Sequence, residues 1–355
     1  MTLFDPPAAP TAPEPAPVTP GDGPAAALAR RVRGAVADAR PLPAGALFAW
    51  AAEAHGGTLA QGAFTPRDAY DAAELGLHLH LVRTVGRLPP EPGAAGDVLA
   101  DVERLSALLP SQTRRTVEQN DYQQFSTPAA YAGLCAWVSG VRAGDRVVEP
   151  SAGTGSLCAF ALAAGASVHA NELSDRRADL LAVLLEETGW DPGGPPPGAL
   201  TRENADHLDA ILPPEVRADV VLMNPPFSQT AGRLGRRRVL TVGTDHVLQA
   251  LRRLDAGGRL VAVLSAGVRR GKPTHREFFG AIDRDPFRLR ADVEVGGAVY
   301  RPYGTSVRTR VLVVDRDGPD GGGAGRRAGE GGALVEGAVD DVAGAVRALA
   351  PVRGR

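Results

Sequence analysis

The chain contains 355 residues, 44% of them hydrophobic, and carries a formal net charge of −2 at pH 7. This length suffices for one large α/β domain with a smaller one, and the nearly neutral charge excludes a uniformly basic protein that coats nucleic acid. The sequence shows no signal-peptide pattern, no apolar stretch long enough to span a membrane and no Cys/His spacing typical of a metal site. We therefore expect a cytoplasmic protein without a bound metal, in which Cys135 and Cys158 are buried apolar residues.

The first third of the chain is predicted to be helical after a Pro- and Ala-rich segment, residues 1–24, which we expect to be disordered. The third helix is the best defined, because Thr65 can cap it and Pro66 suits its first position. We expect a small helical domain over residues 25–110. The helices predicted in it span residues 25–38, 44–55, 66–85 and 95–109.

Strands alternate with helices after residue 128, which predicts a parallel sheet covered by helices on both faces. The last two strands have no helix between them, so one of them should be antiparallel. We assign residues 111–316 to this domain and residues 317–355 to a Gly-rich tail with a short helix over 338–349. The expected helices are 128–140, capped by Ser126 and Thr127, 156–164, 180–187 and 244–254; the expected strands are 145–148, 167–171, one near residue 200, 219–223, 259–265, 289–295 and 309–314.

A glycine-containing turn, Glu149-Pro-Ser-Ala-Gly-Thr-Gly155, follows the first predicted strand. Glycines at this point of a doubly wound sheet let the backbone approach a ligand closely. Glu149 would repel a pyrophosphate and would suit a cationic group, such as the amino group of a methionine moiety. Glu172 and Asp206 follow the next two strands, where acids can bind ribose hydroxyls and an adenine amino group. Together these features predict a cofactor site at the carboxyl edge of the sheet.

The segment Asn224-Pro225-Pro226-Phe227 comes directly after the fourth predicted strand. Its two prolines restrict the backbone, so that the Pro225 carbonyl can lie beside the side-chain oxygen of Asn224. Two fixed acceptors match the two N–H donors of an amino group on a nucleic-acid base, and Phe227 offers a flat face on which the base can stack. The segment therefore predicts chemistry at an exocyclic amino nitrogen that depends on positioning and fixed polarity rather than on a general base.

These motifs and the upstream Gln124-Phe-Ser-Thr-Pro128 resemble the cofactor, catalytic and preceding-helix motifs of N6-adenine DNA methyltransferases, over residues 112–316. The resemblance implies a Rossmann-like methyltransferase fold, S-adenosylmethionine as cofactor and adenine N6 in DNA as the methylated group. It implies catalytic roles for Asn224, Pro225, Pro226 and Phe227. The cofactor-binding residues that it implies are Thr127, Pro128, Glu149, Pro150, Ala152, Gly153, Gly155, Glu172, Leu173, Asp206 and His207.

Three further segments are similar to the methyltransferase-like region of bacterial strawberry notch-type helicase proteins of mobile elements. They are Thr65-Pro-Arg-Asp-Ala-Tyr-Asp71, Leu109-Pro-Ser-Gln-Thr-Arg-Arg115 and Tyr303-Gly-Thr-Ser-Val-Arg-Thr-Arg310. The chain carries no helicase motif, and about forty residues follow the predicted catalytic domain, where restriction-type enzymes carry a large target-recognition domain. We therefore expect weak sequence specificity, or specificity from the helical domain or from a separate specificity or helicase subunit.

Residues 229–316 contain eighteen Lys and Arg but eight Asp and Glu, so positive charge accumulates after the predicted catalytic segment. Contacts to the phosphates of duplex or single-stranded DNA and a solvated Arg-rich surface explain this excess equally well. DNA binding would place the protein at the nucleoid. The candidates for nucleic-acid contact are Arg236, Arg237, Arg238, Arg269, Arg270, Lys272 and Tyr303.

Three other functions fit the same motifs. A methyltransferase could act on an RNA base, because the Asn-Pro-Pro-Phe arrangement suits any planar amino group. It could also act on a protein glutamine, although relatives of that kind usually carry Tyr at the position of Phe227. A catalytically silent module that binds the cofactor or DNA is the third alternative, against which the intact Asn224 and Glu149 argue.

Overall fold

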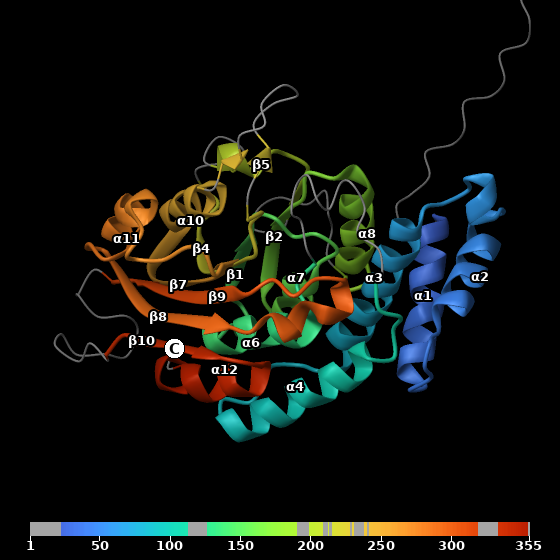
Figure 1. The fold of residues 1–355 in the computed structure, drawn as a ribbon, viewed down its shortest axis with the longest axis horizontal. Coiled ribbons are helices and arrows are strands. Elements are labelled where there is room, and N and C mark those ends of the chain that lie inside the picture. Colours follow the sequence, from blue (N-terminus) through green and yellow to red (C-terminus); the bar gives the residue numbers. More distant parts are fainter. Residues whose placement is uncertain are drawn as a thin grey trace, which may run out of the picture.

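The computed structural model describes residues 23–112, 126–189, 199–208, 212, 215–227, 229–230, 238–239, 241–318 and 333–353. Its centre is an eight-stranded sheet with the strand order β10-β8-β9-β7-β4-β1-β2-β3 (Figure 1). Neighbouring strands in this sheet are parallel, except that β9 runs antiparallel to both β7 and β8. The strands are β1 (Arg146–Glu149), β2 (Ser167–Asn171), β3 (Ala199–Thr201), β4 (Ala218–Met223), β7 (Leu254–Ser265), β8 (Phe287–Val295), β9 (Thr309–Arg316) and β10 (Val335–Val339).

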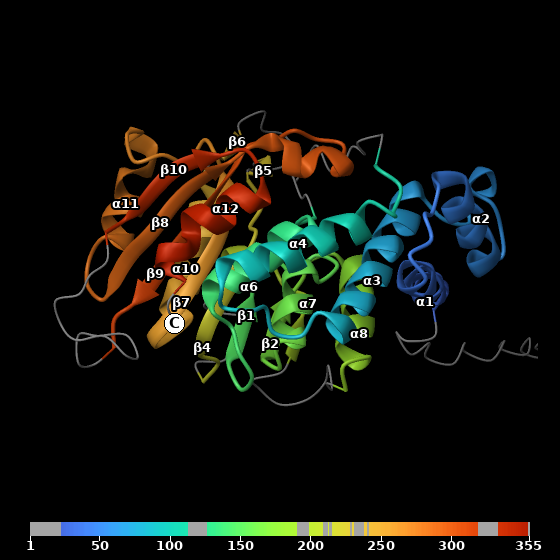
Figure 2. The same cartoon turned by 90° about the horizontal axis from the view of Figure 1, so that it is seen from below.

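Helices cover both faces of the sheet, as the two views show (Figures 1 and 2). One hydrophobic core lies beneath α10 (Val242–Arg253) and α11 (Arg276–Ile282). The other core lies beneath α6 (Ala129–Ser139), α7 (Ser156–Ala163), α8 (Asp175–Glu186) and α12 (Val342–Leu349). Central strands such as β4 are buried on both faces, which explains their continuous apolar sequence. The predicted Rossmann-like sheet with an antiparallel strand in the final hairpin is confirmed.

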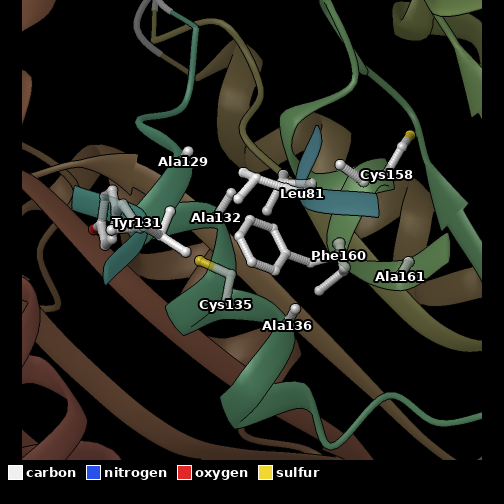
Figure 3. Packing of buried hydrophobic residues seen from close by; sticks show 14 of the residues in the cluster. Leu81, Ala129, Tyr131, Ala132, Cys135, Ala136, Cys158, Phe160 and Ala161 are labelled. Atoms are coloured by element: carbon white, nitrogen blue, oxygen red, sulfur yellow. The ribbon is translucent and has the colours of Figure 1, made fainter. Parts of the chain in front are cut away.

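The helices on the second face pack closely around α6. The ring of Phe160 on α7 lies among Ala132 and Cys135 of α6 and Leu81 (Figure 3). A Cβ atom on Gly133 would come within 2.5 Å of Leu99 Cδ2 and 3.0 Å of the Phe160 ring. Glycine at this position therefore lets two helices approach α6 at once.

Four helices precede the sheet: α1 (Pro24–Ala37), α2 (Ala44–His55), α3 (Pro66–Thr84) and α4 (Pro92–Ser106). A capping box starts α3, as predicted, because the Thr65 hydroxyl accepts from the Asp68 N–H and the Asp68 carboxylate accepts from the Thr65 N–H. Helix α3 is enclosed by α1 on one side and by α7 and α8 on the other. The four helices share one hydrophobic core with the sheet.

Helix α3 buries a row of polar side chains that we call the α3 polar stripe: Arg67, Asp71, Glu74 and His78. Their spacing of three and four residues places them on one face of the helix. Each is at most 6% exposed. This face packs toward α8 and the turn after β1, so the stripe is an internal polar surface rather than a solvated one.

Two sequence predictions differ from the structure. The sheet does not end at residue 316, because β10 pairs in parallel with β8 and α12 packs behind it. Thr127 does not cap α6, whose N-cap is Pro128 without a side-chain cap bond. Its hydroxyl and carbonyl bind other segments instead, as described below. The predicted disorder of residues 1–24 concerns a segment that lies, up to residue 22, outside the described residues.

Candidate active site

A pocket of about 760 Å³ opens where the carboxyl ends of β1, β2 and β4 meet. It brings together segments that are distant in sequence: the chain before α6, the turn after β1, the ends of β2 and β3, and the segment after β4. Its lining includes ten residues expected from the sequence, namely Thr127, Pro150, Ala152, Gly153, Glu172, Leu173, Asn224, Pro225, Pro226 and Phe227. It also includes Ser126, Ser151, Thr154, Ser156, Asn171, Arg177, Glu203, Asn204, Ala205 and His246.

The two glycines of the turn after β1 have different roles. Gly153 has a φ of +59°, and a Cβ there would meet no atom within 4 Å, so this residue faces open space. Its N–H donates to Glu172 Oε2 at 2.8 Å, and Glu172 Oε1 accepts from the Ser174 N–H at 2.9 Å. Gly155 has a φ of +90°, and its Cβ would lie 2.5 Å from Leu184 Cδ2. Gly155 is therefore required for packing against α8, and it does not border the pocket, contrary to the sequence prediction.

Glu149 also lies away from the pocket surface. Its side chain is 2% exposed and accepts a hydrogen bond from Cys158 Sγ at 2.7 Å. Burial raises the pKa of Glu149 to about 8 and raises that of Cys158 as well. The predicted direct contact between Glu149 and a cationic ligand group is not present in this geometry, because the carboxyl group is beneath the turn.

The Asn224 side chain is fixed from the segment before α6. Its Nδ2 donates to Thr127 Oγ1 at 2.9 Å, across 97 residues of sequence. The Thr127 carbonyl accepts from the Ser156 hydroxyl at 2.8 Å. Burial raises the pKa of the Tyr300 phenol well above its usual value, and the neighbouring Asn224 amide offsets only part of this rise. With its NH₂ group directed at Thr127, the amide can present Oδ1 to a ligand, beside the buried ring of Phe227.

A second group of polar side chains lies after β3. His246 Nε2 is 2.7 Å from Asp206 Oδ1, and Asn204 Nδ2 donates to Asp206 Oδ2 at 3.1 Å. Both carboxylate oxygens of Asp206 therefore contact protein groups, and Asp206 does not border the pocket. His246 does border it, is 2% exposed, and its Nδ1 has no partner among the described residues. This nitrogen is a buried polar atom that a ligand in the pocket can satisfy.

The α3 polar stripe supports the turn from behind. Glu74 Oε2 accepts from the Thr154 hydroxyl at 3.0 Å, and Glu74 Oε1 accepts from Gln112 Nε2 at 2.8 Å. His78 Nδ1 donates to the Thr154 carbonyl at 3.1 Å. Burial, with a contribution from the nearby Asp71 charge, raises the pKa of Glu74 to about 7. Burial lowers the pKa of His78 to about 4. Side-chain and backbone atoms of Thr154 are thus both held by one helix.

Several other predicted site residues lie elsewhere. Pro128 and Tyr303 line a second cavity, of about 1070 Å³, bounded by α3, α4 and the start of α6. Arg270 forms an ion pair with Asp283, and Arg269 Nε donates to the Ala266 carbonyl. Lys272 is exposed. Outside the described residues are Arg236, Arg237, Gln124 and the side chains of His207 and Arg238.

The sequence reasoning missed the pocket residues Thr154, Arg177, Asn204 and His246. Thr154 stands inside the quoted turn, and its partners on α3 could have been suspected from the helical spacing of the polar stripe. Arg177 and Asn204 each lie within five residues of a predicted acid. His246 carries no motif, because its place in the pocket depends on how α10 packs on the sheet.

No protein-family model matches the sequence, and no curated protein matches it. Among solved structures, the chain is similar to a Listeria monocytogenes protein described as a class I S-adenosylmethionine-dependent methyltransferase. The two are 12% identical, with a TM-score of 0.50, and the matched region covers 93% of this chain and 98% of that one. At this identity the likeness shows a shared fold.

Two further structures have lower TM-scores. A modification subunit of a type I restriction enzyme from Vibrio vulnificus is 16% identical, with a TM-score of 0.45 and coverage of 71% of this chain and 58% of that one. An RNA methyltransferase from Pyrococcus horikoshii is 18% identical, with a TM-score of 0.43 and coverage of 62% and 96%. The chain thus spans less than two thirds of the Vibrio subunit.

Within the described residues, no helix is both long enough and apolar enough to cross a membrane. Across the same residues, no group of three or more His, Cys, Asp or Glu side chains is arranged to hold a metal ion.

Proposed function

We propose that this protein is an S-adenosylmethionine-dependent methyltransferase that modifies an exocyclic amino nitrogen of a nucleic-acid base, with adenine N6 in DNA the best candidate. The observation that carries this proposal is the Asn224-Pro-Pro-Phe227 segment at the end of β4. It lines the same pocket as the glycine turn and Glu172, and its amide is oriented by Thr127. A cofactor site and an acceptor for an amino group therefore border one cavity.

The pocket residues fit the proposed cofactor. Glu172 lies at the end of β2 on the pocket wall and can accept from ribose hydroxyls. Leu173, which is 48% exposed, can cover one face of an adenine ring. His246 Nδ1, which has no partner among the described residues, supplies an acceptor at the third strand end, and Asp206 holds the ring from its other nitrogen. We retain Thr127, Pro150, Ala152 and Gly153 as cofactor contacts, because they line the pocket.

The chemistry requires orientation rather than proton removal. When bound, S-adenosylmethionine supplies an electrophilic methyl group on a sulfonium. The lone pair of an aromatic amino group is conjugated into its ring and is a poor nucleophile. Asn224 Oδ1 and the Pro225 carbonyl can each accept one amino N–H, which favours a more tetrahedral nitrogen with its lone pair directed at the methyl group. Phe227, which is buried at the pocket, can stack on the base.

The substrate and the setting are parts of the same proposal. A base in a duplex must leave the stack to reach this pocket, whereas a base in a single strand need not. Arg269 and Lys272, with Arg236, Arg237 and Arg238 of the preceding basic segment, are the proposed phosphate contacts. A separate specificity or helicase subunit, a role in a mobile element and a place at the nucleoid belong to this proposal too.

Methyl transfer from labelled S-adenosylmethionine tests the proposal directly. The purified protein and its Asn224→Ala variant are incubated with duplex DNA, single-stranded DNA or RNA, and labelled nucleosides are identified by mass spectrometry. We expect label in N6-methyladenosine from DNA and a loss of about a thousandfold or more in the variant, with cofactor binding retained, because Asn224 acts on the base.

The other outcomes separate the alternatives. Label in RNA alone, lost in the same variant, would move the substrate to an RNA base while preserving the chemistry. Cofactor binding without label on any nucleic acid would contradict the proposal and favour a protein glutamine or a silent binding module. Absence of cofactor binding would contradict the assignment of the pocket itself.

A further inference from the structure

The pocket wall contains an arginine that the proposed function leaves unused. Arg177 lies in the first turn of α8 and lines the pocket, although its side chain is 5% exposed. It is the one lysine or arginine among the described residues that line this pocket, and the carboxylates of the same wall are Glu172 and Glu203. Burial of a guanidinium is costly unless the group is paired.

Asp71 of the α3 polar stripe holds Arg177 from behind. Arg177 Nε lies 3.3 Å from Asp71 Oδ2. Arg176 approaches the same oxygen to 2.7 Å, and Arg67 Nε lies 3.7 Å from it. Burial acts to raise the pKa of Asp71, but the three surrounding arginines hold it below its usual value. Arg176 also pairs with Asp68 at 3.4 Å, so three guanidinium groups share two carboxylates here, and a further anion can approach Arg177 from the pocket side.

The terminal nitrogens of Arg177 are open to such an anion. In the described parts of the chain, the hydrogen bonds of this guanidinium reach Asp71 through Nε alone. The two terminal nitrogens of Arg177 are not fully buried, so a molecule in the pocket can reach them. A guanidinium held at Nε presents donors in a planar fork, and a carboxylate can accept from such a fork through both oxygens.

The position of Arg177 indicates which part of a ligand it meets. Glu74 lies close enough to Arg177 to influence its charge, and Glu74 bonds the Thr154 hydroxyl of the turn. Glu172, the proposed ribose acceptor, is a second carboxylate near Arg177. The guanidinium thus lies near both the strand end that suits ribose and the turn that contains Thr154.

We propose that Arg177 recognises the α-carboxylate of an amino-acid moiety bound in this pocket, and so selects a ligand that carries one. This inference rests on the proposed function, in which S-adenosylmethionine is that ligand. The acidic wall suits the cationic groups of the cofactor, and Arg177 supplies the single complementary cation for its carboxylate. Asp71 acts through Arg177 by fixing the direction of the fork.

A pair of ligands that differ in one group tests this assignment. S-adenosylmethionine and its decarboxylated analogue differ by the carboxylate alone, and 5′-methylthioadenosine retains the nucleoside without either amino-acid group. Dissociation constants are measured by calorimetry for the wild type, Arg177→Gln and Arg176→Gln. Arg176→Gln is the matched control, because Arg176 neighbours Arg177 on α8 and pairs with Asp71 but does not line the pocket.

The expected readout is the preference for S-adenosylmethionine over its decarboxylated analogue. The wild type should prefer the carboxylate by about tenfold or more, as charge-assisted bonds to a carboxylate suggest. Arg177→Gln should reduce this preference by about tenfold, while its affinity for 5′-methylthioadenosine changes by less than about threefold. Arg176→Gln should keep the preference of the wild type.

Each other result overturns a specific statement. If the wild type binds none of the three ligands, the proposed function fails. If it binds them but Arg177→Gln keeps the wild-type preference, the assignment of Arg177 fails while the proposed function stands. An equal loss of preference in Arg176→Gln would show that the charge network around Asp71, not Arg177 itself, is responsible. If thermal unfolding shows that Arg177→Gln is not folded, Arg177→Lys is used instead. Lysine keeps the charge without the planar fork, so the preference for S-adenosylmethionine should fall several-fold.

Discussion

Two clusters of polar side chains border the same pocket and are built differently. The Asn224 cluster consists of Thr127, Ser156 and Asn224, and its members are joined by neutral hydrogen bonds between distant segments. The Asp206 cluster consists of Asn204, Asp206 and His246 and depends on one carboxylate, whose side chain is 34% exposed. Thr127 and Ser156 of the first cluster are buried, whereas the second cluster combines a buried ring with a group open to water.

This difference indicates how one pocket can assign catalysis and ligand binding to separate groups of side chains. Catalysis by positioning needs side chains that cannot shift, because small displacements of reacting groups are costly. Ligand binding tolerates more adjustment, since each contact adds a modest part of the total affinity. We therefore expect changes in the Asn224 cluster to act mainly on turnover and changes in the Asp206 cluster to act mainly on ligand affinity.

The largest effect on this comparison should come from Thr127→Val. Removing the hydroxyl takes away the acceptor for Asn224 Nδ2, so the segment before α6 no longer fixes the orientation of the amide. Turnover of methyl transfer should fall by about 10- to 100-fold. Valine has nearly the same shape as threonine and keeps the apolar contact of residue 127 with the cofactor, so cofactor affinity should change by less than about threefold. Steady-state kinetics with Thr127→Ser as control checks this result, since serine keeps the acceptor. A change in affinity without a change in turnover would break the proposed division.

The next effect concerns Glu149, buried beneath the turn that carries Thr154. Its pKa of about 8 lies above the ordinary value of 4.5, so the folded protein binds this proton more tightly than the unfolded chain. Stability is therefore lost as pH rises from about 5 to 8, and Glu149→Gln should remove this loss, on the order of 4 kcal/mol at pH 8. The free energy of unfolding, measured with urea and plotted against pH, should coincide for the two proteins near pH 5 and differ above it. The same dependence on pH in both proteins would contradict the raised pKa of Glu149.

A smaller effect is expected at the Asp206 cluster. His246→Phe keeps a ring in the pocket but leaves Asp206 Oδ1 without its 2.7 Å partner. Cofactor affinity should fall by about tenfold, while turnover at saturating cofactor changes by less than about threefold. His246→Gln retains a donor and should recover part of the affinity in the same calorimetric measurement. A loss confined to turnover would place His246 with the catalytic cluster instead.

The smallest effect should follow Leu173→Ala. This side chain is 48% exposed, so its apolar surface is available to a ligand rather than to the core. Cofactor affinity should fall by about threefold, which corresponds to the loss of a modest apolar contact. The midpoint of thermal unfolding should not change. A measurable loss of stability would show that Leu173 packs within the protein.

The sheet and the pocket edge were predictable because local patterns determine them. The parallel direction of most strands follows from the alternation of strands and helices, and Asn224 and Glu172 mark strand ends. The missing helix between the last two predicted strands indicated that one of them is antiparallel, and the structure shows that this strand is β9. In contrast, β10 follows a Gly-rich segment and reads Val-Glu-Gly-Ala-Val, in which apolar and polar residues do not alternate, so its pairing with β8 left no period-two signal.

The site contacts could not be predicted where they depend on tertiary packing. Thr127 has the sequence of a helix cap, but Asn224 is its actual partner, 97 residues away. Glu149 and Asp206 were placed at the correct strand ends, yet one is buried beside Cys158 and the other faces His246. Position along a strand predicts which edge a residue reaches, whereas side-chain direction depends on the neighbours that the fold supplies.

The α3 polar stripe also limits how the molecule can be divided. Asp71 pairs with Arg177 on α8, and Glu74 accepts a hydrogen bond from Thr154. Separating α3 from the sheet would therefore leave ionised groups without their partners. The helices before residue 110 are therefore a poor unit for exchange between proteins, although the sequence suggested a boundary there. A chimera joined at residue 110 would have to bring matching partners for all four stripe residues, whereas one joined before Thr65 would leave the pocket's internal support intact.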